Sequence, residues 1–174
     1  MALYDFKKNL LFSKGQNGLN DIQTIQKMLH GCSDCSPSVD LNMDKHGVDY
    51  IATLRKGAEV YVDAKTRRAG CSRWWRNGEE VAIEKWSIMP GGKYSIPENR
   101  KKTGWTLDES KITDLILFTW DKSDCDAAYL VSFQTLRVAA NKNIKKWMQM
   151  FKTDTQDSRH WESQAVFVPI KVVL

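Results

Sequence analysis

The sequence predicts a mixed α/β fold, in which a β-sheet is flanked by helices and an irregular, Trp-rich insertion interrupts the sheet. Two amphipathic helix patterns, a tight β-hairpin and a near-continuous apolar run predict this class. A chain of 174 residues, 42% of them apolar, has the size and composition of one globular domain. We therefore expect a single domain over residues 1–174, with the insertion at about 66–110.

The N-terminal part of the chain contains one clear helix pattern. Asn20 can cap the first turn while the Gln23 side chain reaches back to it, and a glycine ends the pattern. The apolar face of this helix consists of Ile22, Ile25, Met28 and Leu29. Residues 1–19 predict a short helix and a loop. Residues 32–47, rich in Ser, Asp, Asn and Pro, predict a loop with at most a short strand at 39–41.

The middle of the chain contains the strand signals. Residues 48–54 and 58–65 read as two strands, and the tight link at 55–57 makes them an antiparallel hairpin. Residues 66–110 contain four of the seven Trp without sustained periodicity, which predicts an irregular insertion with one or two short strands. The apolar run at 112–120 is typical of a strand covered on both faces, so we expect it in the centre of the sheet.

The C-terminal part predicts a strand, a helix and a last strand. Residues 128–131 form a short strand, and Ser132 can cap the long helix that follows. The buried face of this helix is expected to consist of Phe133, Leu136, Ala140, Ile144, Trp147 and Phe151. A polar loop at 153–163 leads to a strand at 165–173, in which Pro169 argues for an edge position.

Composition narrows the classes of function. The net charge is +5 and the isoelectric point is near 9.0, which favours a polyanionic partner. No apolar run reaches the roughly 18 residues of a membrane span and no export signal is present, so we expect no membrane partner. Four Cys without an export signal suit reduced thiols in the cytoplasm. No glycine-rich phosphate loop or serine-hydrolase motif is present, which disfavours nucleotide-driven and serine-hydrolase chemistry.

Two carboxylates and a lysine are expected to converge on the hairpin. Residues two apart on a strand share a face, so Asp63 and Lys65 project together. Antiparallel pairing brings Asp49, at the start of the first strand, to the same end of the hairpin. Carboxylate oxygens are the ligands that Mg²⁺ or Mn²⁺ prefers, and a lysine beside them can neutralise charge developing on a phosphate. The alternative is that Asp63 and Lys65 form an exposed charge pair with a purely structural role.

This arrangement resembles the catalytic motif of the PD-(D/E)XK nuclease superfamily, which includes type II restriction endonucleases and Holliday junction resolvases. Thirteen residues separate Asp49 from Asp63-Ala-Lys65, and the order of helix, hairpin, strands and helix is compatible with the family core. The resemblance implies a restriction-endonuclease-like fold and a Mg²⁺ or Mn²⁺ cofactor. It implies that Asp49, Asp63 and the Ala64 carbonyl bind the metal and that Lys65 is the catalytic lysine. Some members add an acidic residue on the first helix, for which Asp21 is the nearest but a poor match.

Basic and aromatic residues near the motif are candidate contacts to nucleic acid. Arg binds phosphate bidentately, and Trp can stack on an unpaired base. The candidates are Arg67, Arg68, Arg73, Trp74, Arg76, Lys101 and Lys102. Ordinary packing of the tryptophan and a solvated loop around the two lysines are the alternatives.

The sequence therefore predicts a metal-dependent deoxyribonuclease that hydrolyses phosphodiester bonds in DNA. The alternative is a non-catalytic module of the same fold that binds nucleic acid or protein. A small chain without a separate recognition domain favours cutting directed by DNA structure, or a homodimer that makes paired nicks. Cys32 and Cys35 have the spacing of a zinc knuckle, but a closed site needs two more ligands.

Overall fold

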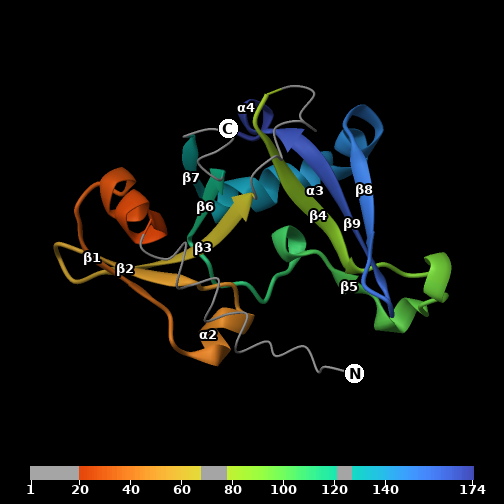
Figure 1. The fold of residues 1–174 in the computed structure, drawn as a ribbon, viewed down its shortest axis with the longest axis horizontal. Coiled ribbons are helices and arrows are strands. Elements are labelled where there is room, and N and C mark those ends of the chain that lie inside the picture. The colour runs from red at the N-terminus through yellow and green to blue at the C-terminus, as the bar shows by residue number, and fades with distance from the viewer. Residues whose placement is uncertain (1–19, 68–77, 121–126) are drawn as a thin grey trace.

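The protein has a mixed α/β fold with two β-sheets (Figure 1). The structure is a computed structural model and describes residues 20–67, 78–120 and 127–174. The strands of the first sheet, in spatial order, are β1 (Cys32–Pro37), β2 (Tyr50–Leu54), β3 (Glu59–Arg67), β6 (Leu115–Trp120) and β7 (Ala128–Ser132). Only the β3–β6 pair of this sheet is parallel.

The second sheet is antiparallel throughout. Its strands, in spatial order, are β5 (Lys102–Thr103), β4 (Glu80–Ile88), β9 (Glu162–Pro169) and β8 (Thr153–Asp157). The helices are residues 20–28, α2 (Leu41–Lys45), α3 (Phe133–Met150) and α4 (Ile170–Val173), with 3-10 turns η2 (Gly92–Tyr94), η3 (Glu98–Arg100) and η4 (Trp105–Leu107). None of the helices in the described ranges is long and apolar enough to cross a membrane.

The two sheets share the larger hydrophobic core. Residues of β6, β7 and α3 pack there against Val81 and Ile83 of β4 and against Val166 and Val168 of β9. A smaller core lies on the other face of the first sheet, where Ile25 of the helix at 20–28 is fully buried. The first sheet is therefore covered on both faces near its centre.

This arrangement gives the two faces of β3 different environments. Val62 and Ala64 belong to the smaller core. Asp63 and Lys65 are in parallel register with Ile116 and Phe118 of β6, which pack in the larger core. Since aligned residues of neighbouring strands point to the same side, the two charged residues face the second sheet.

Several expectations from the sequence are confirmed. The hairpin forms as β2 and β3, the apolar run becomes the central strand β6, and β7 pairs beside it. Ser132 caps α3 by accepting a hydrogen bond from the backbone N–H of Thr135. The predicted apolar face of α3 is buried from Phe133 to Trp147, and Phe151 packs partly buried against the core.

The prediction of a loop at 32–47 is wrong. Residues 32–37 form the edge strand β1, in which Cys35 alone is buried, so the segment is polar because one face meets solvent. Helix α2 follows, and Asp40 caps it by accepting a hydrogen bond from the N–H of Asn42 at 2.7 Å. Its five residues are too few to show a helical period in the sequence.

The second sheet corrects three further predictions. Within the expected irregular insertion, β4 is a nine-residue strand that pairs with β9. The expected polar loop at 153–163 contains β8, whose residues are all exposed. The last strand is central, not at an edge, and ends at Pro169, where α4 begins. Pro169 lies beyond the end of β8, so its missing N–H removes no hydrogen bond from that side.

Candidate active site

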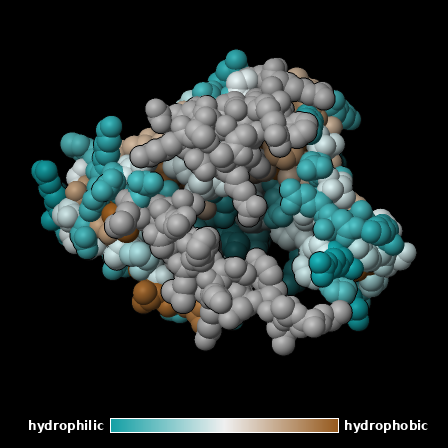
Figure 2. All heavy atoms as spheres, viewed as in Figure 1, coloured by the Kyte–Doolittle hydropathy of each residue, from teal (hydrophilic) through white to brown (hydrophobic). Residues whose placement is uncertain are grey.

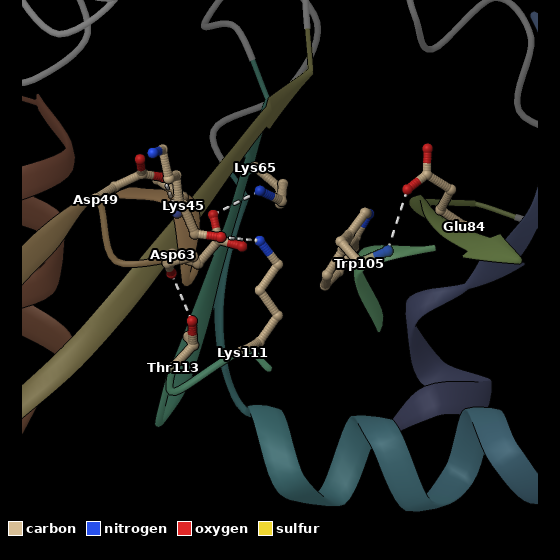
Figure 3. A network of polar contacts seen from close by, with 10 residues as sticks. Lys45, Asp49, Asp63, Lys65, Glu84, Trp105, Lys111 and Thr113 are labelled. Atoms are coloured by element: carbon tan, nitrogen blue, oxygen red, sulfur yellow. Dashed lines mark hydrogen bonds and ion pairs between the residues drawn. The ribbon is translucent and has the colours of Figure 1, made fainter. Parts of the chain in front are cut away.

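The hairpin brings Asp49 against the backbone on either side of Asp63 (Figure 3). The N–H of Asp49 donates to the Val62 carbonyl at 2.9 Å, and the N–H of Ala64 donates to Asp49 Oδ2 at 2.9 Å. These two hydrogen bonds straddle Asp63 and fix the Asp49 carboxylate at its side. The convergence expected from the sequence is therefore present.

Asp63 is a buried carboxylate with one cationic partner. Its residue exposure is 4%, and its Oδ1 accepts a hydrogen bond from Lys65 Nζ at 2.5 Å. Burial raises the pKa of Asp63 to about 7; the Lys65 charge opposes this shift, and the neighbouring Asp49 carboxylate adds to it. The exposure that the alternative expects is therefore wrong for Asp63, because its carboxylate is withdrawn from water.

Lys65 sits between two carboxylates and an aromatic ring. Burial acts to lower its pKa, but the charges of Asp63 and Asp49 outweigh burial and the net pKa is raised. The ammonium therefore stays charged. Its nitrogen also lies 5.1 Å from the ring centroid of Trp105, which favours the cation further.

The opposite wall of the site comes from the second sheet. Trp105, in η4, is held by its backbone N–H, which donates to Glu84 Oε2 of β4 at 3.1 Å. Figure 3 shows Lys65 and Trp105 facing each other across the space between the sheets. In Figure 2 hydrophilic atoms are visible deep in the middle of this face of the molecule.

Trp105 was not among the contacts expected from the sequence. The one feature of the sequence that could have indicated its position is Gly104, the residue before it. A Cβ on Gly104 would lie 2.0 Å from the Glu84 carbonyl oxygen, so only glycine lets η4 approach β4 this closely.

Two loops close the lower side of the site. The Thr113 hydroxyl donates to the Gly47 carbonyl, and Lys111 Nζ donates to the Lys45 carbonyl at 2.7 Å. Gly47 has φ +84°, and a Cβ there would lie 2.9 Å from Thr113 Oγ1 and 3.8 Å from Asp63 Oδ2. The segment before Asp49 is therefore packed closely against the segment before β6.

A third carboxylate, Asp21, lies close enough to Asp49 for the Asp49 charge to affect its pKa. It lies on the helix at 20–28, is 6% exposed, and accepts a hydrogen bond from the Tyr50 hydroxyl at 3.1 Å. Burial raises the pKa of Asp21 to about 6, the Tyr50 hydrogen bond lowers it, and the Asp49 charge raises it again. Asp21, the poor match to the acidic residue of the family's first helix, therefore lies where the Asp49 charge affects its pKa.

Of the seven expected nucleic-acid contacts, the structure describes the side chains of Lys101 and Lys102. Lys101 pairs with Glu98 and lies 5.6 Å from the ring centroid of Trp86, and Lys102 is exposed in β5. Both therefore belong to the β5 edge of the second sheet, not to the carboxylate pair. Arg67 ends β3, and its side chain lies outside the described part of the chain, as do Arg68, Arg73, Trp74 and Arg76.

The residues present fit a divalent cation that is shared with a substrate. In the described ranges, no three His, Cys, Asp or Glu side chains gather as a metal-binding group. Mg²⁺, however, is commonly held by one or two carboxylates and completed by water and phosphate oxygens. The carboxylates of Asp49 and Asp63 supply oxygen ligands of that kind. Cys32 and Cys35 are free thiols on β1, and Cys32 Sγ donates to the Asp34 carbonyl.

Comparisons of the chain with protein-family models, curated proteins and solved structures found no match. The function proposed below therefore draws on the geometry of the chain itself.

Proposed function

We propose that the chain is a metal-dependent deoxyribonuclease that hydrolyses phosphodiester bonds in DNA with Mg²⁺ or Mn²⁺. One observation carries the proposal: the carboxylates of Asp49 and Asp63 converge beside Lys65, and the more buried of them has a raised pKa. Strongly perturbed carboxylates of this kind cluster at functional sites.

The charge balance of the group favours a cation. The buried Asp63 carboxylate lies beside the Asp49 carboxylate and forms an ion pair with Lys65, and a buried carboxylate is costly unless it is fully compensated. A divalent cation would add positive charge between the two carboxylates. The fold gains no stability from keeping Asp63 buried beside Asp49, so the arrangement is better explained by a site than by packing.

Each residue of the group has a role suited to phosphodiester hydrolysis. Asp49, Asp63 and the Ala64 carbonyl would hold the cation, which when bound polarises a phosphoryl oxygen and makes water a better nucleophile. The Lys65 ammonium, oriented by Asp63 on one side and Trp105 on the other, neutralises charge developing on the phosphate. Asp63 thus positions Lys65 as well as binding the cation.

The topology also supports a restriction-endonuclease-like fold of the PD-(D/E)XK type. A helix precedes the hairpin, β6 and β7 extend the same sheet, and α3 follows. The net charge of +5 suits a partner made of phosphates. The free thiols of Cys32 and Cys35 support a reducing, cytoplasmic location.

A second candidate function is nucleic-acid binding without cleavage. The ring of Trp86 has the ammonium groups of Lys85 and Lys101 at 5.7 and 5.6 Å from its centroid. An aromatic ring between two cations is suited to hold a strand whether or not the carboxylates bind metal.

Cleavage assays on the full chain test the proposal. Supercoiled, linear, single-stranded and four-way-junction DNA would be incubated with Mg²⁺, Mn²⁺ or EDTA, using wild type, Asp63→Ala and the exposed control Asp157→Ala. We expect metal-dependent cutting by wild type and the control and none by Asp63→Ala. Direct conversion of supercoiled DNA to the linear form would indicate a homodimer that cuts both strands. Binding without cutting by folded wild type, in every metal, would favour the second candidate.

A further inference from the structure

A cavity of about 280 Å³ lies between the two sheets, beside Lys65. It is lined from β3, β4, β6 and η4. The side chains that matter for its chemistry are Lys65, Thr66, Glu80, Trp105, Phe118 and Trp120. The cavity is thus continuous with the candidate active site, because Lys65 belongs to both.

The aromatic walls of the cavity are held in place from behind. Trp105 stacks on Phe133 of α3, with centroids 6.2 Å apart and planes inclined by 20°. Trp120 meets Tyr129 of β7 edge-on at 5.7 Å. A ligand therefore meets rings whose orientation is fixed before it binds, which reduces the ordering cost of binding.

Polar groups lie at the margins of these apolar walls. Lys65 carries hydrogen-bond donors, and Glu80 of β4, which is 3% exposed, carries carboxylate oxygens. Apolar faces with polar edges match the chemistry of a nucleobase, which presents flat π-faces and a rim of donors and acceptors.

The volume limits the ligand to a small one. Sites for small molecules usually measure roughly 300 to 1,000 Å³, so a cavity of about 280 Å³ is at the small end of this range and suits a ligand of the size of one base. A base that is stacked and paired within a duplex cannot reach such a cavity. Only an unpaired base can enter.

We propose that the cavity receives the base of a nucleotide whose neighbouring phosphate is bound by Lys65, beside the carboxylates of Asp49 and Asp63. This inference rests on the proposed function, which identifies the ligand of Lys65 as a DNA phosphate. Since the same ammonium contacts Asp63 and faces Trp105, the phosphate and the base would lie on either side of one side chain. The substrate class is therefore DNA with an unpaired or extruded nucleotide at the cut, such as single strands, bulges and mismatches.

A binding experiment without cleavage tests this proposal. A single-stranded oligonucleotide with 2-aminopurine at one central position would be titrated with the full chain in EDTA. Stacking on tryptophan quenches 2-aminopurine, so wild type should lower its fluorescence severalfold. Ala82→Leu adds apolar atoms to the cavity from β4 and should remove the quenching and weaken binding about tenfold. The matched control Ala58→Leu, exposed in the hairpin turn, should behave as wild type.

A competition experiment that uses only the wild-type protein does not depend on whether the Ala82→Leu variant folds. Deoxyadenosine monophosphate should restore the fluorescence, and deoxyribose 5-phosphate at the same concentration should not. Equal quenching by wild type and a folded Ala82→Leu, or equal competition by the two phosphates, would overturn the proposal. Because the assay contains no metal, either result would leave metal-dependent cutting intact, and loss of cutting would leave the base-binding result intact.

Discussion

Two Asp–Lys pairs in this chain have opposite electrostatics. Asp157 of β8 is exposed and accepts hydrogen bonds from Lys93, Tyr94 and the N–H of Arg159, and these bonds lower its pKa. Asp63 of β3 is buried, has Asp49 beside it, and has a pKa raised to about 7. The exposed carboxylate is surrounded by donors, whereas the buried one shares a single lysine with another carboxylate.

This difference separates a structural pair from a functional one. The folded chain stabilises the ionised form of Asp157 relative to water, so this pair needs no further partner. The folded chain destabilises the ionised form of Asp63, which stays buried because the surrounding strands hold it there. Lys65 lies two residues from Asp63, whereas Lys93 and Asp157 are 64 residues apart, so the sequence shows the first pair but not the second.

The largest expected effect is on cleavage. Asp63→Asn keeps the shape of the side chain but removes its charge, so we expect DNA cutting to slow by about a thousandfold or more. Asp157→Asn should cut within about twofold of wild type, because its side chain lies on β8, the exposed edge strand of the second sheet. Initial rates on a single-stranded substrate in Mn²⁺ would measure both. An equal loss of cleavage rate in the two variants would show that the Asp63–Lys65 pair is no more important for cutting than the Asp157–Lys93 pair.

The second effect is a pH dependence of stability. The folded-state pKa of Asp63 is above the unfolded value of 3.8, so the folded chain binds more protons between about pH 4 and pH 7. Its contribution to the free energy of unfolding therefore falls as pH rises through that window and is constant above it. Asp21, with a pKa of about 6, acts in the same direction over a narrower window.

Asp63→Asn cannot titrate, so it should remove the contribution of Asp63 to the change of the free energy of unfolding with pH. Relative to wild type, the variant should gain about 1 to 4 kcal/mol between pH 4.5 and pH 7.5, since each pKa unit corresponds to about 1.4 kcal/mol. Urea unfolding in EDTA at several pH values would measure the difference. Parallel curves for the two proteins would show that Asp63 has an ordinary pKa.

A smaller effect concerns the backbone that positions Asp49. Gly47→Ala places a methyl group 2.9 Å from Thr113 Oγ1 at a positive φ, so we expect a loss of about 1 to 3 kcal/mol and slower cutting. Gly57→Ala is the matched control, because Gly57 has φ +81° with no atom within 4 Å of the added Cβ. It should lose about 1 kcal/mol and keep its activity. Identical behaviour of both variants in urea unfolding and cleavage would show that the contact at Thr113 is unimportant.

The smallest effect is on the exposed pair itself. Asp157→Asn removes the partner of Lys93 and Tyr94, and surface pairs contribute little. We expect the thermal midpoint to fall by less than about 3 °C, and by less still in 0.5 M salt, where screening weakens the pair. A larger, salt-independent fall would place Asp157 among the residues that hold the second sheet together.

The first sheet was largely predictable because its signals are local. The hairpin has a tight turn between two alternating strands, β6 is a continuous apolar run, and α3 has both a cap and a periodic apolar face. Asp49, Asp63 and Lys65 could be placed together because the register of a hairpin follows from its turn.

The second sheet was not predictable because its strands depend on partners far away in the sequence. β4 pairs with β9 across about 80 residues, and β8 has no buried side chain to mark it as a strand. Trp105 reaches the site only because Gly104 packs against the Glu84 backbone, a contact between segments 20 residues apart. Asp21 is bound by the Tyr50 hydroxyl across 29 residues of sequence, a contact that no spacing rule predicts.

Mn²⁺ binding to wild type, Asp63→Asn and Asp157→Asn, measured by electron paramagnetic resonance at pH 7.5 without DNA, tests most directly whether the buried carboxylates form a cation site. We predict one saturable site in wild type and in Asp157→Asn, and its loss in Asp63→Asn. Equal binding by all three proteins, or none by wild type, would contradict the assignment of Asp49 and Asp63 as metal ligands.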